Sequence, residues 1–302
     1  MRAMDTSVPV LESDLAEIFP ELGLLRDQAC SGDLGPVLPV LRRIRSEDVL
    51  DHAVSVEVVA VADGVDRALE TLLEAHPEDR ELRTLHAARI LFSDEPGALV
   101  ETERLLVRQC AEDPGDPTAW YLRLVAAGRA GLPRGEARRR YDRLRAAAGQ
   151  DHPLGQRVLV ECFHPPPGGS WTETLEVAAT VSEYAPDGSE AHAVVPATYL
   201  ASWLDRGPTR DVASLRVPGV VDEIDAAAKR FGATRCSSRY GWVAAHTAFA
   251  VTLGLAGRRA SSTAHFRALG PLVDRGIWTA VADHHDDLLA IRDLALAQGR
   301  RR

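Results

Sequence analysis

The chain has 302 residues, a net charge of −9 at pH 7, and a single lysine, Lys229, among its 35 basic residues. This acidic balance excludes a general nucleic-acid-binding protein, which needs a basic surface to displace phosphate counterions. Hydrophobic residues make up 45% and charged residues 26% of the chain, a composition typical of a globular protein with its own core.

The N-terminal sequence MRAMDTSVPVLESDLAEIF contains no apolar stretch long enough for a signal peptide, and no window approaches the roughly 18 apolar residues that suggest a membrane span. The four cysteines are far apart in the sequence and form no CxxC pair, which excludes a zinc knuckle. We therefore expect a cytoplasmic protein with reduced cysteines and no membrane partner.

Short helical patterns follow a loose leader at residues 1–10. The first hairpin pairs an apolar stripe at residues 22–29 with another at residues 37–44. A further helix is predicted to begin at Ser46 to Asp48, where a hydroxyl and two acids can cap the free amides, and to run to about residue 63. Within it, the segment HAVSVEVVAVA at 52–62 alternates as a strand would but fits a buried helix equally well.

Three helical patterns occupy residues 64–112, separated by HPED at 76–79 and SDEPG at 93–97. Asp116 followed by Pro117 matches a capped helix start. Further on, Ser170 and Glu173 have the spacing of a capping box, which predicts a helix from Trp171.

The C-terminal part contains two helices within 189–231, a hairpin from 238 to 271 and a last helix at about 279–298. That last helix carries ADHHDD and is expected to cap the array with a polar face. Residues 299–302 form a frayed tail.

Prolines mark a repeat of similar length along the chain. Pro77 and Pro114 are 37 residues apart, Pro117 and Pro153 are 36 apart, and Pro153 and Pro186 are 33 apart. Helix pairs that repeat near 34 residues are typical of tetratricopeptide-like hairpins, whereas other helical solenoids have longer units.

Two stretches, 117–186 and 238–271, resemble tetratricopeptide repeats most clearly. The residues that match the family's large, small and turn positions in the first stretch are Trp120, Leu124, Ala127, Gly131, Ala137, Tyr141 and Leu144. In the second they are Phe249, Ala250, Leu253, Gly257, Phe266, Leu269 and Pro271. His246 and Ser262 stand where the family usually has tryptophan and alanine. The GGSW and APDGS segments are also similar to uncharacterised actinobacterial helical-repeat proteins, a likeness that implies no function.

The resemblance implies an all-α, right-handed helical-hairpin solenoid, with residues 11–298 as one continuous array. It also implies a protein- or peptide-binding scaffold without a catalytic group, because stacked hairpins create an extended concave surface. The groove residues expected from it are Trp120, Arg123, Arg129 and Trp242. No cofactor is expected, the partner is a protein or peptide, and the sequence leaves a homo-oligomer open.

A second hypothesis is an enzyme or a small-molecule or metal-binding protein on the same scaffold. Its pocket would be formed by His246, His265, Asp283, His284 and Asp287, because imidazole and carboxylate groups at helical spacing can bind a metal. The competing interpretation is that acids gather near a helix N-terminus, where the helix dipole stabilises them. A regulatory domain of a signalling protein is a third hypothesis, which no helix-turn-helix or kinase-like segment supports. Catalytic motifs such as G-x-S-x-G are absent from the sequence, so the sequence does not indicate which reaction an enzyme of this kind would catalyse.

Overall fold

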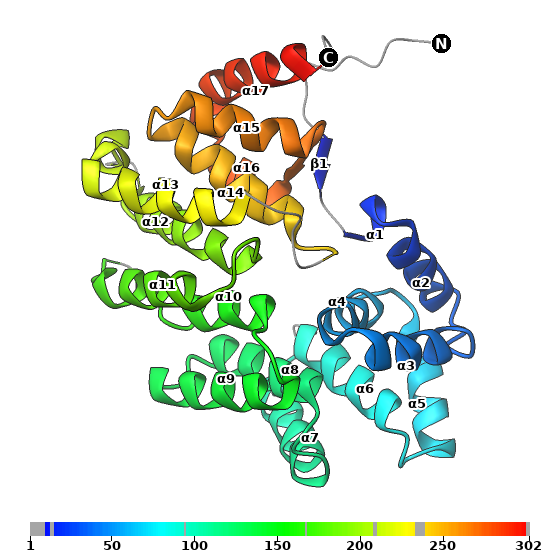
Figure 1. Cartoon of the computed structure of the whole chain (residues 1–302). Helices are drawn as coiled ribbons and strands as arrows, with labels where there is room; N and C mark the ends of the chain where they lie inside the picture. The colour runs from blue at the N-terminus through cyan, green and yellow to red at the C-terminus, as the bar shows by residue number, and fades with distance from the viewer. Residues whose placement is uncertain are drawn as a thin grey trace, which may run out of the picture. The chain divides into compact units, whose positions relative to one another are not determined.

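The computed structural model describes residues 10–12, 15–93, 95–166, 168–207, 210–232 and 239–299. Helices make up most of these residues, which confirms the predicted all-α class (Figure 1). Two three-residue strands, β1 (Val10–Glu12) and β2 (Leu272–Asp274), pair in parallel with Val10 opposite Leu272. Along the described chain, no helix combines the length and the apolar character that crossing a membrane requires.

Contacts divide the chain into two compact units. The N-terminal unit is residues 14–162, and the C-terminal unit is residues 163–302 together with residues 1–13. The boundary lies within the predicted repeat 117–186. The predicted single array, 11–298, stays a prediction, and the leader and the tail lie mostly outside the described residues.

Ten helices are described in the N-terminal unit. They are α1 (Leu15–Ile18), α2 (Pro20–Cys30), α3 (Val37–Glu47), α4 (Val49–Ala60), α5 (Val65–Ala75), α6 (Arg80–Phe92), α7 (Ala98–Glu112), α8 (Pro117–Arg129), α9 (Arg134–Ala148) and α10 (Pro153–Glu161). The helices α2, α4, α6, α8 and α10 contact one another in succession, while α3, α7 and α9 pack against neighbouring pairs of them. Antiparallel pairs such as α8 and α9 are seen as hairpins in Figure 1.

The central helix of this unit is α4, which explains the ambiguous segment 52–62. This segment is helical up to Ala60, and Ala53, Val56 and Val59 are fully buried. Since α4 packs against α2, α3, α6 and α8, it buries several faces and shows no clear polar stripe.

Four helices of this unit begin with the same kind of capping contact. Asp48, Asp79 and Asp116 accept hydrogen bonds from the free amides at the starts of α4, α6 and α8, and His152 Nδ1 accepts one from Gly155 N at the start of α10. The last three caps are 37 and 36 residues apart, which matches the proline period. The predicted cap at Asp116 is confirmed, and Asp48 rather than Ser46 caps α4.

The C-terminal unit contains α11 (Thr172–Tyr184), η1 (Glu190–Ala193), α12 (Val194–Leu204), η3 (Val212–Arg216), α13 (Pro218–Gly232), α14 (Trp242–Leu255), α15 (Arg259–Leu269), α16 (Arg275–Ala280), η4 (Ala282–His284) and α17 (His285–Gly299). At its centre lies α14, which contacts α12, α13, α15, α16 and α17. Its Val243, Phe249 and Leu253 are fully buried.

Two local predictions in this unit differ from the structure. The helix expected from Trp171 begins one residue later, at Thr172, with Trp171 at the N-cap. Ser170 Oγ accepts a 3.3 Å hydrogen bond from Thr172 N. The expected single helix at 279–298 is divided, since α16 ends at Ala280, η4 follows and α17 begins at His285. Asp274 caps α16 through a 2.8 Å bond from Ile277 N.

Candidate functional site

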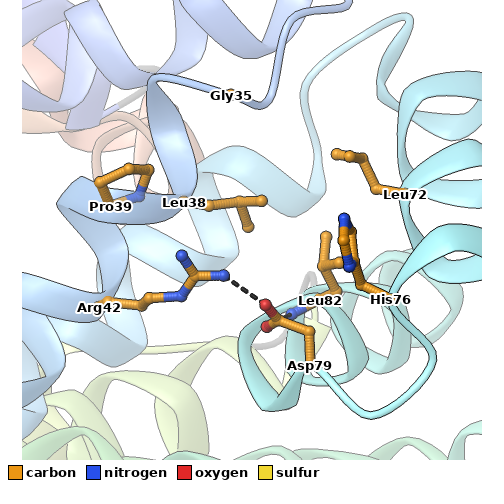
Figure 2. Close-up of a pocket in the computed structure, with 8 residues that line it drawn as sticks. All are labelled: Gly35, Leu38, Pro39, Arg42, Leu72, His76, Asp79 and Leu82. Carbon is orange, nitrogen blue, oxygen red and sulfur yellow. Dashed lines mark hydrogen bonds and ion pairs between the residues drawn. The ribbon is translucent and has the colours of Figure 1, made fainter.

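A pocket of about 330 Å³ opens between α3, α5 and α6 in the N-terminal unit (Figure 2). Its lining residues are Gly35, Leu38, Pro39, Arg42, Leu72, His76, Asp79 and Leu82. The volume lies at the small end of the range of ligand sites, about 300–1,000 Å³. Apolar groups supply most of its wall, while Arg42, His76 and Asp79 supply the polar groups.

The HPED turn between α5 and α6 positions one wall of this pocket. Asp79 Oδ1 accepts hydrogen bonds of 2.9 Å from Glu81 N and 3.2 Å from Leu82 N, so that the carboxylate is fixed by the start of α6. At the other end of the turn, the His76 amide closes α5 by donating to Leu72 O. The turn thus fixes the backbone of His76 and the carboxylate of Asp79.

Arg42 of α3 reaches across the pocket and forms an ion pair with Asp79 (Figure 2). The Arg42 side chain is 49% exposed and that of Asp79 is 21% exposed. The Asp79 carboxylate already accepts two backbone hydrogen bonds, whereas the guanidinium of Arg42 keeps further N–H donors for a ligand. In this pair, the groups still available to hydrogen-bond a ligand are therefore mainly the N–H donors of Arg42.

A buried polar network lies one turn further along α3. Arg45 donates to Glu81 Oε2 at 3.0 Å and to Asp116 Oδ2 at 3.1 Å. Burial raises the pKa of Glu81, but its hydrogen bond with His52 and the charge of Arg45 outweigh this effect and hold the pKa below its usual value. Burial likewise raises the pKa of Asp116, and Arg45 and Arg80 outweigh it.

The charge of Glu81 fixes the tautomer of His52. Because the ionised carboxylate only accepts, His52 Nε2 must donate along the 2.8 Å contact with Glu81 Oε1. In the neutral ring, Nδ1 then accepts from the hydroxyl of Thr118 at 2.7 Å. The network therefore links α3, α4, α6 and α8.

The sequence-predicted groove residues of α8 take part in contacts within the protein. Arg123 is 9% exposed, lies 4.9 Å over the ring of Trp120, and donates to Glu103 at 2.7 Å. Trp120 Nε1 donates to Pro114 O at 2.9 Å. The guanidinium of Arg129 donates to Leu91 O. The structure therefore brings Trp120 and Arg123 together and directs Arg129 to the end of α6.

Trp242 belongs to the C-terminal unit, where it begins α14 and packs edge-on near His246, with ring centroids 6.3 Å apart. The binding roles proposed for Trp120, Arg123, Arg129 and Trp242 stay predictions.

The histidines of the second hypothesis do meet. His246 of α14 and His265 of α15 lie with their Nδ1 atoms 2.9 Å apart. Burial lowers the pKa of His246 to about 4, and burial together with the neighbouring His246 lowers that of His265 to about 3. Both rings are therefore neutral at neutral pH.

The acidic residues expected beside these histidines have other contacts. Asp283 pairs with Arg210, and the ring of His284 lies 5.3 Å from that of Trp203. Asp287 is exposed near the start of α17. Throughout the described part of the chain, no group of three or more His, Cys, Asp or Glu side chains is arranged to hold a metal ion.

Sequence reasoning missed the pocket, although a signal for it exists. Arg42 and Asp79 are 37 residues apart, Arg45 and Glu81 are 36 apart, and Arg80 and Asp116 are 36 apart. These separations match the proline spacings of 37 and 36 residues. Opposite charges separated by one period would have pointed to these residues.

Comparisons of the chain with models of protein families, with curated proteins and with solved structures find no match. The likeness to tetratricopeptide repeats therefore depends on the residues quoted above, and the packing of helix on helix is compatible with it.

Proposed function

We propose that the protein is a peptide- or protein-binding scaffold, built as a right-handed array of helical hairpins, and that the pocket between α3, α5 and α6 receives the partner. The occupant we infer is a peptide segment that inserts an aliphatic side chain and places a carboxylate beside Arg42. The observation that carries this proposal is the pocket itself, with apolar walls and an arginine at its mouth.

Charge supports the choice of an acidic segment. Asp79 is held by the α6 amides and by Arg42, while Arg42 is half exposed and has donors to spare. A ligand carboxylate can therefore bind Arg42 without displacing Asp79 from the start of α6. A hydrogen bond to a charged group contributes about 1.5–3 kcal/mol, enough to determine which peptides bind.

The apolar wall supports an aliphatic side chain. Leu38 and Leu82 are buried and Leu72 is partly buried, so a methyl group entering the pocket would exchange water for carbon contacts. Each buried CH₂ group contributes about 0.8 kcal/mol. The negative charge of the whole chain gives no reason to propose a nucleic-acid partner.

The test is a selection of random peptides displayed on phage against the full chain, followed by titration of synthetic peptides from the enriched set. We expect enriched peptides to pair an aliphatic residue with an acid. Arg42→Ala should weaken their affinity by about 10-fold or more, since it removes a charge-assisted hydrogen bond, and Leu72→Ser should weaken it as well.

Arg43→Ala is the matched control, because Arg43 lies on the same helix and pairs with Glu47, one turn away. The Arg43→Ala variant should bind the enriched peptides with unchanged affinity. No enriched peptide, or equal affinity of the Arg42→Ala and Arg43→Ala variants, would overturn the proposal. Binding of a small organic acid in the pocket without any peptide binding would instead favour the small-molecule hypothesis.

A further inference from the structure

The cap at the start of α10 differs from the other three caps of the N-terminal unit, because its accepting atom can take up a proton. The side chain of His152 is fully buried, and its Nδ1 accepts a 3.0 Å hydrogen bond from Gly155 N. This bond fixes the tautomer: the accepting Nδ1 carries no proton, so the neutral ring carries its proton on Nε2. The cap therefore requires a neutral imidazole.

The packing around this ring offers nothing to a second N–H group. The Nε2 atom of His152 is buried, and the structure gives it no hydrogen-bond partner. The ring is stacked on that of Tyr121 from α8, with centroids 5.3 Å apart, and the Tyr121 hydroxyl donates to Glu57 Oε1 at 2.6 Å. A Cβ atom on Gly155 would lie 2.4 Å from Leu144 of α9. The first turn of α10 is thus held close between the ring and its neighbours.

The charges near the ring do not compensate for a proton on it. The charged and titratable groups around the first turn are Asp48 at the start of α4, Asp151 beside the histidine in the chain, and Tyr141 of α9 next to Gly155. Burial lowers the pKa of His152 to about 4, outweighing a backbone hydrogen bond and the charge of Asp48, which both raise it. The closed site therefore favours the neutral ring.

We propose that α10 is an acid-sensitive helix, in which protonation of His152 removes the cap of the first turn and releases that turn from α8 and α9. A hydronium ion gives its proton to Nδ1, so that one N–H bond forms, a water molecule is left, and Gly155 N–H loses its acceptor. Two donors then face each other, and the charged ring has no acceptor at Nε2. Opening of the turn lets water solvate both groups.

The pH range of the opening follows from the sign of the shift. An exposed histidine has a pKa of 6.5 and the buried His152 one of about 4, so between these values the open form binds a proton that the closed form excludes. The closed turn is fully stable above about pH 6.5, and its equilibrium constant falls by up to about 10-fold per pH unit as the pH is lowered toward 4. The pKa of Asp116 stays below its usual value of 3.8, because burial is outweighed by the charges of Arg45 and Arg80. The cap of α8 therefore persists over the same range.

The test is hydrogen exchange of the full chain, measured by mass spectrometry at about pH 7 and about pH 4.5, with the original chain and His152→Asn compared at each pH. Asparagine caps a helix through a neutral oxygen that does not titrate in this range. We expect the exchange rate of residues 153–161 in the original chain, relative to the variant, to rise by about 10-fold or more on acidification.

His76→Asn is the control, because His76 is exposed in the same unit, and it should behave like the original chain at both pH values. An unchanged ratio between the original chain and His152→Asn would overturn the inference.

A comparison within the original chain keeps the test decisive if His152→Asn misfolds. The helix α8 begins with the same kind of hydrogen bond, accepted by the carboxylate of Asp116. On acidification, α10 should lose protection relative to α8 by about 10-fold or more, whereas a parallel loss in both helices would contradict the inference. The outcome is independent of the proposed peptide pocket, whose lining includes no residue of α10.

Discussion

At the scale of single residues, the N-terminal unit depends on carboxylates that serve two functions at once. Asp116 caps α8 through Oδ1 and accepts from Arg45, Arg80 and Gln109 through Oδ2. It is fully buried, yet its hydrogen bonds use both oxygens. Removing it would leave the guanidinium of Arg45 facing a buried site without this counter-charge.

We expect Asp116→Ala to lower the free energy of unfolding by about 3–5 kcal/mol, because it breaks a buried ion-pair network and removes a helix cap. Asp113→Ala is the matched control. Asp113 also pairs with Arg80, at 2.5 Å, but its side chain is 39% exposed, so the loss should be within about 1 kcal/mol. Urea denaturation followed by circular dichroism measures both, and equal losses would contradict the assignment.

At the scale of elements, α4 and α14 are the helices around which the two units pack. Both are apolar on most of their surface, and both contact several other helices. Such a helix gives no amphipathic pattern in the sequence, since almost every position faces protein. For the ambiguous sequence of α4, packing against the neighbouring helices favours a helix over a strand.

The burial of α4 predicts a large difference between two valines near its end. Val59 is fully buried and Val61 is 58% exposed. Val59→Ala should cost about 2 kcal/mol or more, from lost burial plus a cavity, whereas Val61→Ala should change the free energy of unfolding by less than about 0.5 kcal/mol. Thermal or urea unfolding of the two variants compares them directly, and similar losses would mean that α4 is not the centre of the unit.

At the scale of the whole molecule, the contacts separate residues 14–162 from residues 163–302. Each unit has its own central helix and its own polar network or apolar core. The proposed peptide pocket belongs to the first unit.

The division into two units also predicts which residues lose protection when one unit is destabilised by a substitution. Leu253 of α14 is fully buried, and Leu253→Ala should cost about 2–5 kcal/mol in the C-terminal unit. We expect hydrogen exchange measured by mass spectrometry to rise within residues 163–299 and to change little within residues 15–162, because substitutions without shared contacts act independently. Loss of protection in both units would indicate one cooperative array instead.

The sequence by itself determined the all-α class and the positions of most helices. Prolines, the cap at Asp116, and apolar stripes act over a few residues, so their effect can be read without knowing the fold. The same local rules placed the start of α11 one residue early and missed the division between α16 and α17.

Only the tertiary structure decided the candidate sites. Arg42 meets Asp79 across 37 residues, and Arg123 donates to Glu103 across 20 residues. The sequence suggested that His246 and His265 share a pocket, but their 2.9 Å contact and the different partners of Asp283 and His284 follow from how the helices pack. The physical reason is that a helix start depends on near neighbours in the chain, whereas a pocket or ligand pair depends on distances between helices that no local pattern encodes.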